Sequence, residues 1–207
     1  MIKERAVEVL EIEAAGILEI AGKLDDSFTR VIELILASRG RVILSGIGKS
    51  GLIGKKIVAT LNSTGTLALF LHPVEAMHGD LGAVSADDIL LALSNSGETV
   101  ELNALIPSVK RIGCKVVALT GNPASSLAKN SDLVLDVGVA KEACPLGLAP
   151  TTSTTALLAM GDALAVVLTD KKEFKSSDFK RFHPGGALGQ RLSASIAELM
   201  LSGTAIP

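Results

Sequence analysis

A short polar turn between Ser94 and Thr99 has the composition of a phosphate site. It reads Ser-Asn-Ser-Gly-Glu-Thr and follows an apolar run. The hydroxyl groups of Ser94, Ser96 and Thr99, with the free N–H groups at the start of a following helix, would form a cradle for a phosphate dianion. The alternative is ordinary capping of that helix. Three hydroxyl side chains exceed the needs of one cap, so the turn favours phosphate.

A glycine-rich loop at residues 46–54 carries Lys49 and Ser50 at its lip. Its glycines match the dinucleotide fingerprint, but the next apolar run ends in Phe-Leu-His-Pro and lacks the acid that holds a ribose. The phosphate loop of nucleotide hydrolases is excluded because Ile43 stands where its first glycine belongs. A small-anion or sugar site, or a purely structural turn, is left.

The third loop contains a candidate general base. Residues 141–147 read Lys-Glu-Ala-Cys-Pro-Leu-Gly, and Glu142 is either a proton acceptor or a solvated loop acid. Cys144 has no histidine nearby in the sequence, which argues against a thiol nucleophile. The run Thr151–Thr155 that follows is either a second anion cradle or the cap of a long apolar helix.

The three histidines, His72, His78 and His183, do not have the spacing of a helical zinc motif. A lone histidine is more often structural than catalytic. His183, however, opens the run His-Pro-Gly-Gly-Ala-Leu-Gly, whose glycines indicate a close approach of the backbone to another group.

An alternation of short apolar runs and helical stretches would position these loops. It is typical of a parallel sheet with helices on both faces, in which ligands bind at the carboxyl ends of the strands. We expect strands, each buried on both faces, at 41–44, 67–71, 89–93, 115–119 and 133–137, and helices at 50–63, 74–84, 98–112, 124–130 and 153–168. Two further helices should come first, the earlier ending near Gly22 and the later capped by Asp25, Asp26 or Ser27 and ending near Gly40.

Composition narrows the class of protein. Of 207 residues, 48% are apolar and 20% charged, with a net charge of -2, no Trp and no Tyr. This predicts a globular protein with no basic stripe or stacking platform for nucleic acid. No uninterrupted apolar run approaches the roughly 20 residues of a membrane span, and the N-terminus lacks a signal sequence, so we expect a cytoplasmic protein that does not bind membranes.

Together, the segments 46–54, 72–82, 94–101, 141–155 and 183–192 resemble the arabinose-5-phosphate isomerases of the sugar isomerase (SIS) family. The most specific part is Lys-Glu-Ala-Cys-Pro-Leu-Gly-Leu-Ala-Pro-Thr combined with His-Pro-Gly-Gly-Ala-Leu-Gly. The resemblance implies an α/β three-layer sandwich with a five-stranded parallel sheet over residues 1–192. It also implies a homotetramer with active sites between subunits.

The resemblance further implies interconversion of ribulose 5-phosphate and arabinose 5-phosphate through an enediol, on the route to the lipopolysaccharide sugar Kdo, without a cofactor. Glu142 is the first choice of base and Glu101 the second, and His183 suits acid–base work or ring opening. Lys49, assisted by Ser50, would stabilise an oxyanion or hold the phosphate, with His78 near the same site. No metal is required, although His78 and His183 are possible adventitious ligands.

Many members of this family carry a pair of CBS modules after the isomerase domain. The segment 197–200 resembles the start of such a module, so residues 193–207 are expected to be a C-terminal tail or the beginning of a truncated module. Two other functions stay open from the sequence. One is a different SIS-fold isomerase acting on a hexulose or heptulose phosphate, and the other is a non-catalytic sugar-phosphate sensor.

Overall fold

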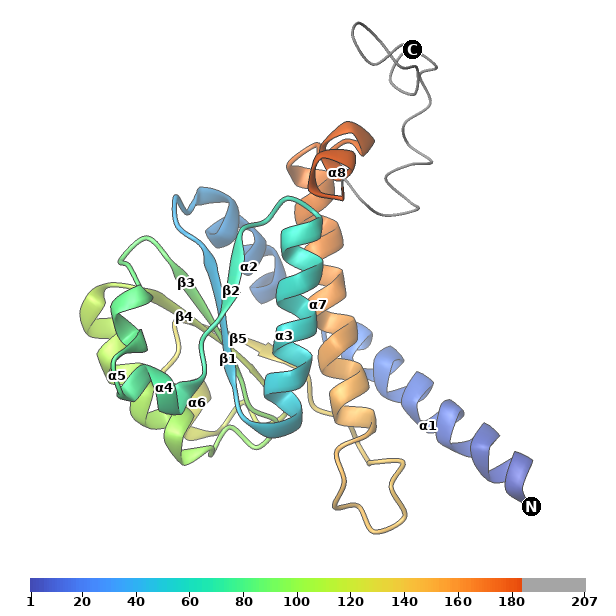
Figure 1. Cartoon of the computed structure of the whole chain (residues 1–207). Helices are drawn as coiled ribbons and strands as arrows, with labels where there is room; N and C mark the ends of the chain where they lie inside the picture. Colours follow the sequence, from blue (N-terminus) through green and yellow to red (C-terminus); the bar gives the residue numbers. More distant parts are fainter. Residues whose placement is uncertain (184–207) are drawn as a thin grey trace, which may run out of the picture.

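The computed structural model describes residues 1–183, which form three layers around a parallel sheet, with the N-terminal helix projecting from one end (Figure 1). All strands are parallel, in the order β2-β1-β3-β4-β5. The strands are β1 Val42–Gly46, β2 Ala68–Phe70, β3 Ile89–Leu93, β4 Lys115–Thr120 and β5 Leu133–Asp136. The predicted α/β three-layer sandwich with five parallel strands is therefore confirmed.

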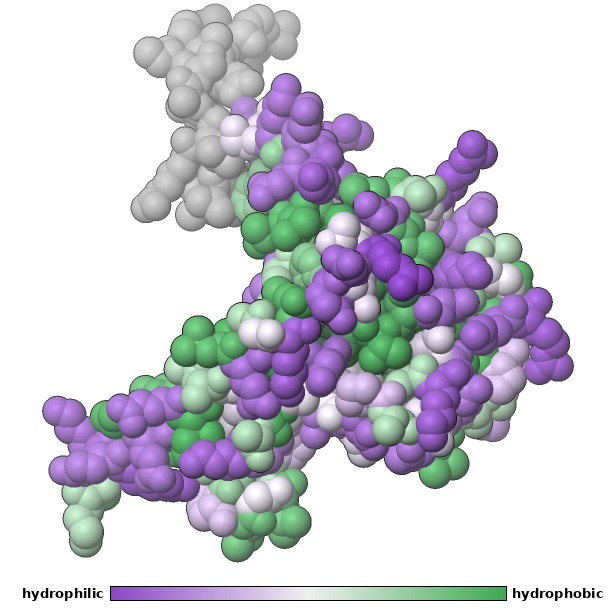
Figure 2. Space-filling view, turned by 180° about the vertical axis from the view of Figure 1, so that it is seen from behind, coloured by the Kyte–Doolittle hydropathy of each residue, from purple (hydrophilic) through white to green (hydrophobic). Residues whose placement is uncertain are grey.

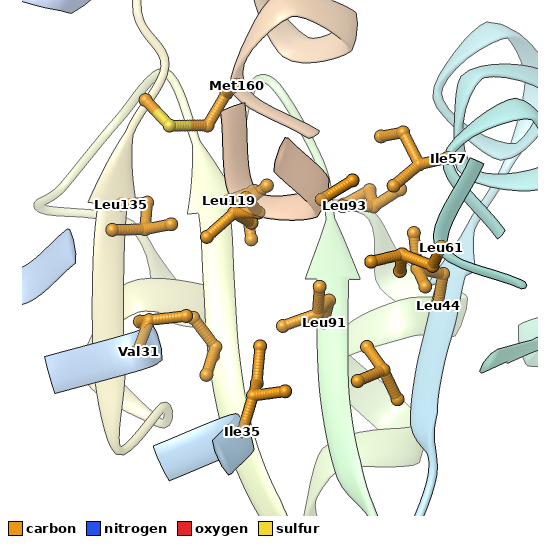
Figure 3. Packing of buried hydrophobic residues seen from close by; sticks show 14 of the residues in the cluster. Val31, Ile35, Leu44, Ile57, Leu61, Leu91, Leu93, Leu119, Leu135 and Met160 are labelled. Carbon is orange, nitrogen blue, oxygen red and sulfur yellow. The ribbon is translucent and has the colours of Figure 1, made fainter. Parts of the chain in front are cut away.

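The helices divide between two apolar clusters, one on each face of the sheet. The larger cluster joins the sheet to α2, α3 and α7, and Figure 3 shows Val31, Ile57 and Met160 meeting strand residues there. The smaller cluster joins the other face to α4, α5 and α6. The helices are α1 Ile2–Gly22, α2 Asp26–Ala37, α3 Gly48–Ser63, α4 Pro73–Met77, α5 Val100–Ile112, α6 Ser126–Lys129, α7 Thr152–Lys171 and α8 Ser176–Phe182, with a 3₁₀ turn η1 Asp80–Ala83.

Burial on both faces was wrong for two of the five predicted strands. Residues 42–46 and 89–93 are buried throughout, and β4 is exposed only at its first residue. The strands β2 and β5 are partly exposed because they form the two edges of the sheet. Apolar runs in edge and central strands look alike in sequence, so strand order decided the difference.

The predicted helix 74–84 was also wrong, because it is two short elements. It breaks at Gly79, whose φ of +133° is incompatible with a continuous helix. The predicted helix 124–130 is a single turn, α6. The first helix ends at Gly22 as expected, and Asp25 caps α2 by accepting a hydrogen bond from Ser27 N at 2.8 Å. That helix ends at Ala37, earlier than predicted, because Ser38 is extended.

In the C-terminal part, the predicted apolar helix at 153–168 is confirmed as α7, and one further helix was not expected. By length and composition α7 could cross a membrane, but half of its most apolar window is buried, and it packs in the core beside α1 and α3. The short helix α8 was not predicted. Residues 184–207, which hold most of the motif 183–192 and the predicted tail 193–207, lie outside the described residues.

Candidate active site at the carboxyl end of the sheet

All but one of the predicted site residues lie in loops or first helical turns beyond the carboxyl ends of strands. Because the strands are parallel, their carboxyl ends all lie at the same end of the sheet (Figure 1). Lys49 and Ser50 follow β1, His78 follows β2, Ser94, Ser96, Thr99 and Glu101 follow β3, and Glu142 follows β5.

His183 is the exception, because it lies at the opposite end of the molecule. It follows α8, where its ring stacks on Phe179 and its Nδ1 lies 2.9 Å from the carbonyl oxygen of Phe179. Between α8 and Glu142 runs α7, whose 20 residues span about 30 Å. Within one chain, His183 therefore does not meet the other site residues (Figure 1).

The Ser94–Thr99 turn is held in shape by its own side chains. Ser94 Oγ lies 2.8 Å from Thr99 Oγ1 and accepts a hydrogen bond from Gly97 N at 3.0 Å. Ser94 is buried, whereas Ser96 is exposed. Among residues 1–183, no side chain caps α5, so these residues do not support the simple capping interpretation of this turn. The uncapped first turn of α5 and the accessible Ser96 hydroxyl are consistent with an anion cradle.

Two glycines permit the close approach of these loops. Gly97 has a φ of +68°, and a Cβ there would lie 2.0 Å from Ser125 Oγ. A Cβ on Gly51 would lie 2.7 Å from the carbonyl oxygen of Gly46, so α3 begins directly against the end of β1. This packing places Lys49, which is exposed, and Ser50, which is partly buried, at the N-terminus of α3.

Glu142 is the most firmly held acid of the site. Its Oε2 accepts hydrogen bonds from Thr151 N at 2.8 Å, Thr151 Oγ1 at 3.1 Å and Ser153 N at 3.2 Å. The hydrogen bonds recorded in the described part of the chain engage Oε2 and leave Oε1 available. Glu142 thereby caps the N-terminus of α7, a use of the Thr151–Thr155 run that the sequence alone did not reveal.

The environment of Glu142 keeps its carboxylate ionised. Burial raises the pKa, but the donors of Ser153 and Thr151 outweigh it, and the pKa lies below its usual value. Glu101, by contrast, is exposed in the first turn of α5, where the helix dipole favours a carboxylate. His78 is exposed at the end of α4. The geometry thus distinguishes a held acid from an exposed one.

Two hollows with residues in common lie at this end of the sheet, and Glu142 lines the larger one. An open cleft of about 570 Å³ is lined by Glu142, Lys141 and Cys144, among others. A smaller, more enclosed pocket of about 40 Å³ shares Asn95 and Pro150 with that cleft and is lined by Ser50, Leu119, Val137, Ser153, Thr154 and Leu157 as well. Sequence reasoning missed Asn95 and Ser153, because only the fold shows that they border the same pocket.

Other parts of the described chain show less chemistry. A cavity of about 430 Å³ lies beside β5 where α1 meets α2, but its Lys23 is already paired with Glu19 and the carbonyl oxygen of Gly138. Within residues 1–183, no group of three or more His, Cys, Asp or Glu side chains could hold a metal ion. Of the possible metal ligands, His78 follows α4 and His183 follows α8, and these two helices lie at opposite ends of the molecule (Figure 1).

The fold is a five-stranded parallel α/β sandwich, and its serine- and glycine-rich loops follow the carboxyl ends of the strands. This is the arrangement of a sugar isomerase domain. The family model for the SIS domain matches residues 35–167, more than half of the chain, and the chain belongs to the SIS domain family.

Among relatives, the chain is 52% identical over 195 residues to the probable arabinose 5-phosphate isomerase of Haemophilus influenzae. It is 48% identical over 202 residues to the arabinose 5-phosphate isomerase KdsD of Pseudomonas aeruginosa. The matches cover 94% and 98% of this chain but only 58% and 62% of those proteins.

Solved structures show the same fold. A structure of an E. coli CFT073 protein in complex with arabinose 5-phosphate superposes with a TM-score of 0.86 at 39% identity, covering 88% of this chain and 97% of that one. A putative phosphosugar isomerase involved in capsule formation from Bacteroides fragilis superposes with a TM-score of 0.86 at 40% identity, covering 90% and 99%.

Proposed function

We propose that the chain is an arabinose 5-phosphate isomerase that interconverts D-ribulose 5-phosphate and D-arabinose 5-phosphate in the cytoplasm, for the biosynthesis of Kdo and lipopolysaccharide. The observation that carries the proposal is the ionised Glu142, fixed by Thr151 and Ser153 beside an open cleft. The similarity to curated isomerases supports the choice of substrate. The SIS domain is proposed to extend over residues 1–192.

The chemistry follows from the placement of the loops. The substrate phosphate binds at the Ser94–Thr99 turn and the first turn of α5, which brings the sugar chain across the cleft toward Glu142. Glu142 uses Oε1 to move a proton between C1 and C2, and Lys49 stabilises the oxygen that becomes negative in the enediolate. Glu101 is the second acid of the site, and Ser50 assists Lys49. The proposal requires no metal or cofactor.

His183 leads to a proposal about assembly. We propose a homotetramer with active sites between subunits, in which His183 of one chain acts at the Glu142 of another and opens the sugar ring. The projecting α1 supports this, because its Ile2, Leu10 and Leu18 are between 67% and 91% exposed. Figure 2 shows hydrophobic patches among hydrophilic residues along the projecting arm.

Incubation with ribulose 5-phosphate, followed by separation of the aldose products, tests the function. If the proposed function is correct, the aldose product is arabinose 5-phosphate. Turnover of a hexulose or heptulose phosphate alone would indicate another SIS-fold isomerase. Binding of sugar phosphates without any turnover would indicate a sensor. Sedimentation in parallel should show a tetramer, and a fully active monomer would contradict the proposed assembly.

A further inference from the structure

One hydroxyl group at the edge of the site is buried without a partner. Ser153 is 4% exposed, and its Oγ makes no hydrogen bond with any described residue. Buried hydroxyls in native proteins are nearly always paired, because an unpaired one loses its hydrogen bonds to water without replacement. Ser153 also lines the enclosed pocket of about 40 Å³. A ligand group that enters this pocket would therefore supply the hydrogen bond that Ser153 Oγ lacks.

The pocket limits what that group can be. Its volume of about 40 Å³ is less than a tenth of the 570 Å³ of the open cleft beside it, so it suits one end of a ligand and not a whole sugar phosphate. The buried side chains of Leu119, Val137 and Leu157 form an apolar wall. Ser50 and Asn95 supply further polar groups, the first from the first turn of α3 and the second from the loop after β3.

The position of Ser153 ties the pocket to the proposed base. Its backbone N–H donates to Glu142 Oε2 at 3.2 Å, so the hydroxyl and the carboxylate belong to one rigid unit at the start of α7. The hydroxyl lies near enough to Glu142 to help lower the pKa of that acid, yet it makes no hydrogen bond of normal geometry with it. The proposed phosphate cradle, the Ser94–Thr99 turn, lies just before a different helix, α5.

We infer that Ser153 is a substrate-binding residue whose Oγ donates a hydrogen bond to one oxygen at the reacting end of the sugar phosphate, held in this pocket beside Glu142. The inference rests on the proposed function, since it assigns the pocket to the C1–C2 end of that substrate. In a largely apolar pocket such a bond is stronger than in water, and it fixes the reacting carbons against the base.

The test compares Ser153→Ala with Ser45→Ala. Ser45 is the matched control, because it too is a fully buried serine whose Oγ has no partner in the described chain, but it does not line the pocket. Ser153→Ala should lower kcat/KM by about 10- to 100-fold, the range between one ordinary hydrogen bond and one donor to a developing oxyanion. Ser45→Ala should leave it unchanged.

Two further measurements separate binding at the reacting end from other roles. Calorimetry should show weaker binding of arabinose 5-phosphate to Ser153→Ala, while competition by inorganic phosphate stays as in the unmodified protein. Should the alanine variant fail to fold, Ser153→Cys keeps the packing with a poorer donor and should show the same pattern.

Three results would overturn the inference. They are an unchanged kcat/KM and sugar-phosphate affinity in a folded Ser153 variant, a parallel loss of inorganic phosphate binding, or an equal loss in Ser45→Ala. A protein that binds arabinose 5-phosphate through Ser153 but never turns over ribulose 5-phosphate would contradict the proposed function and leave the subsite standing.

Discussion

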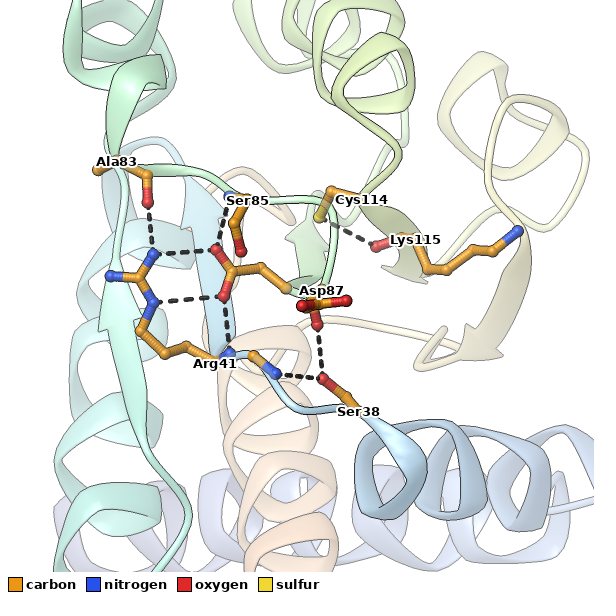
Figure 4. Close-up of polar contacts among 9 residues, drawn as sticks. Ser38, Arg41, Ala83, Ser85, Asp87, Cys114 and Lys115 are labelled. Carbon is orange, nitrogen blue, oxygen red and sulfur yellow. Dashed lines mark hydrogen bonds and ion pairs between the residues drawn. The ribbon is translucent and has the colours of Figure 1, made fainter.

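The two ends of the sheet each hold a buried or partly buried carboxylate, and they treat it differently. At the amino end, Asp88 is 1% exposed and both of its oxygens accept hydrogen bonds. Figure 4 shows Arg41 and Ser85, which donate these bonds. The donors are Arg41 N at 2.7 Å, the Arg41 guanidinium and Ser85 N at 2.8 Å. At the carboxyl end, the donors that Glu142 receives from the described residues all reach Oε2.

The two cysteines repeat this contrast. Cys114 lies at the amino end of the sheet, just before β4, and burial raises the pKa of its thiol to about 12. Cys144 lies in the loop after β5, where the backbone N–H groups of Ala149 and Leu146 lower the pKa of its thiol. Both oxygens of Asp88 are paired within the chain, whereas at the carboxyl end Ser153 Oγ has no hydrogen-bond partner among the described residues. The first arrangement stabilises the fold, and the second is the one that we propose to support chemistry.

The largest effect should come from removing the charge of Glu142. Glu142→Gln keeps an oxygen that can cap α7 but loses the proton acceptor, so turnover of ribulose 5-phosphate should fall by about 10²- to 10⁴-fold. Steady-state kinetics measure this. Glu13→Gln is the control. Glu13 also bonds to the first turns of α7, because it accepts a hydrogen bond from Thr155 Oγ1 at 2.9 Å. Equal losses in both variants would show that Glu142 only supports α7.

The cysteine contrast predicts selective alkylation. At neutral pH only the thiolate reacts, so iodoacetamide should label Cys144 roughly 10³-fold faster than Cys114 in the folded protein. Mass spectrometry of peptides from a time course measures both rates. Similar rates in the native state would contradict the difference between the two ends, and similar rates in denaturant serve as the control.

A smaller effect, on stability, should follow from Asp88→Asn. The amide cannot accept on both sides, and it leaves Arg41 without its partner, so the free energy of unfolding should fall by about 2 to 3 kcal/mol. Urea titration measures this, and kcat of the folded variant should be unchanged. A variant that lost activity but kept its stability would reverse the roles of the two ends.

The pH dependence of stability gives Asp88 a second test. Burial raises its pKa, but the bonds from Arg41 and Ser85 outweigh this and hold the pKa below its usual value. The stabilisation is therefore complete above the unfolded pKa of about 3.9 and is lost as the pH falls through the lower folded pKa. The unmodified protein should lose stability over that acid range more steeply than Asp88→Asn.

Much of the carboxyl end could be predicted from the sequence, because glycine, serine and threonine directly after apolar runs are typical of ligand-binding loops in a parallel α/β fold. The amino end was not predicted. Arg41 and Asp88 are ordinary charged residues flanking strands, and only the pairing of β1 with β3 brings them together. The pocket lined by Ser153 depends on three loops meeting, and the break at Gly79 depends on a backbone angle. His183 was predicted in the site, but a single chain holds it elsewhere.

The central claim is that Glu142 transfers a proton through an enediol. Running the isomerisation of ribulose 5-phosphate in heavy water tests it most directly, because a carboxylate that carries the migrating proton exposes it to exchange with solvent. The account predicts deuterium at C2 of the arabinose 5-phosphate formed by the unmodified protein, and at most about a hundredth as much product from Glu142→Gln over the same time. Complete retention of the substrate's own hydrogen, together with dependence on an added divalent metal, would contradict it.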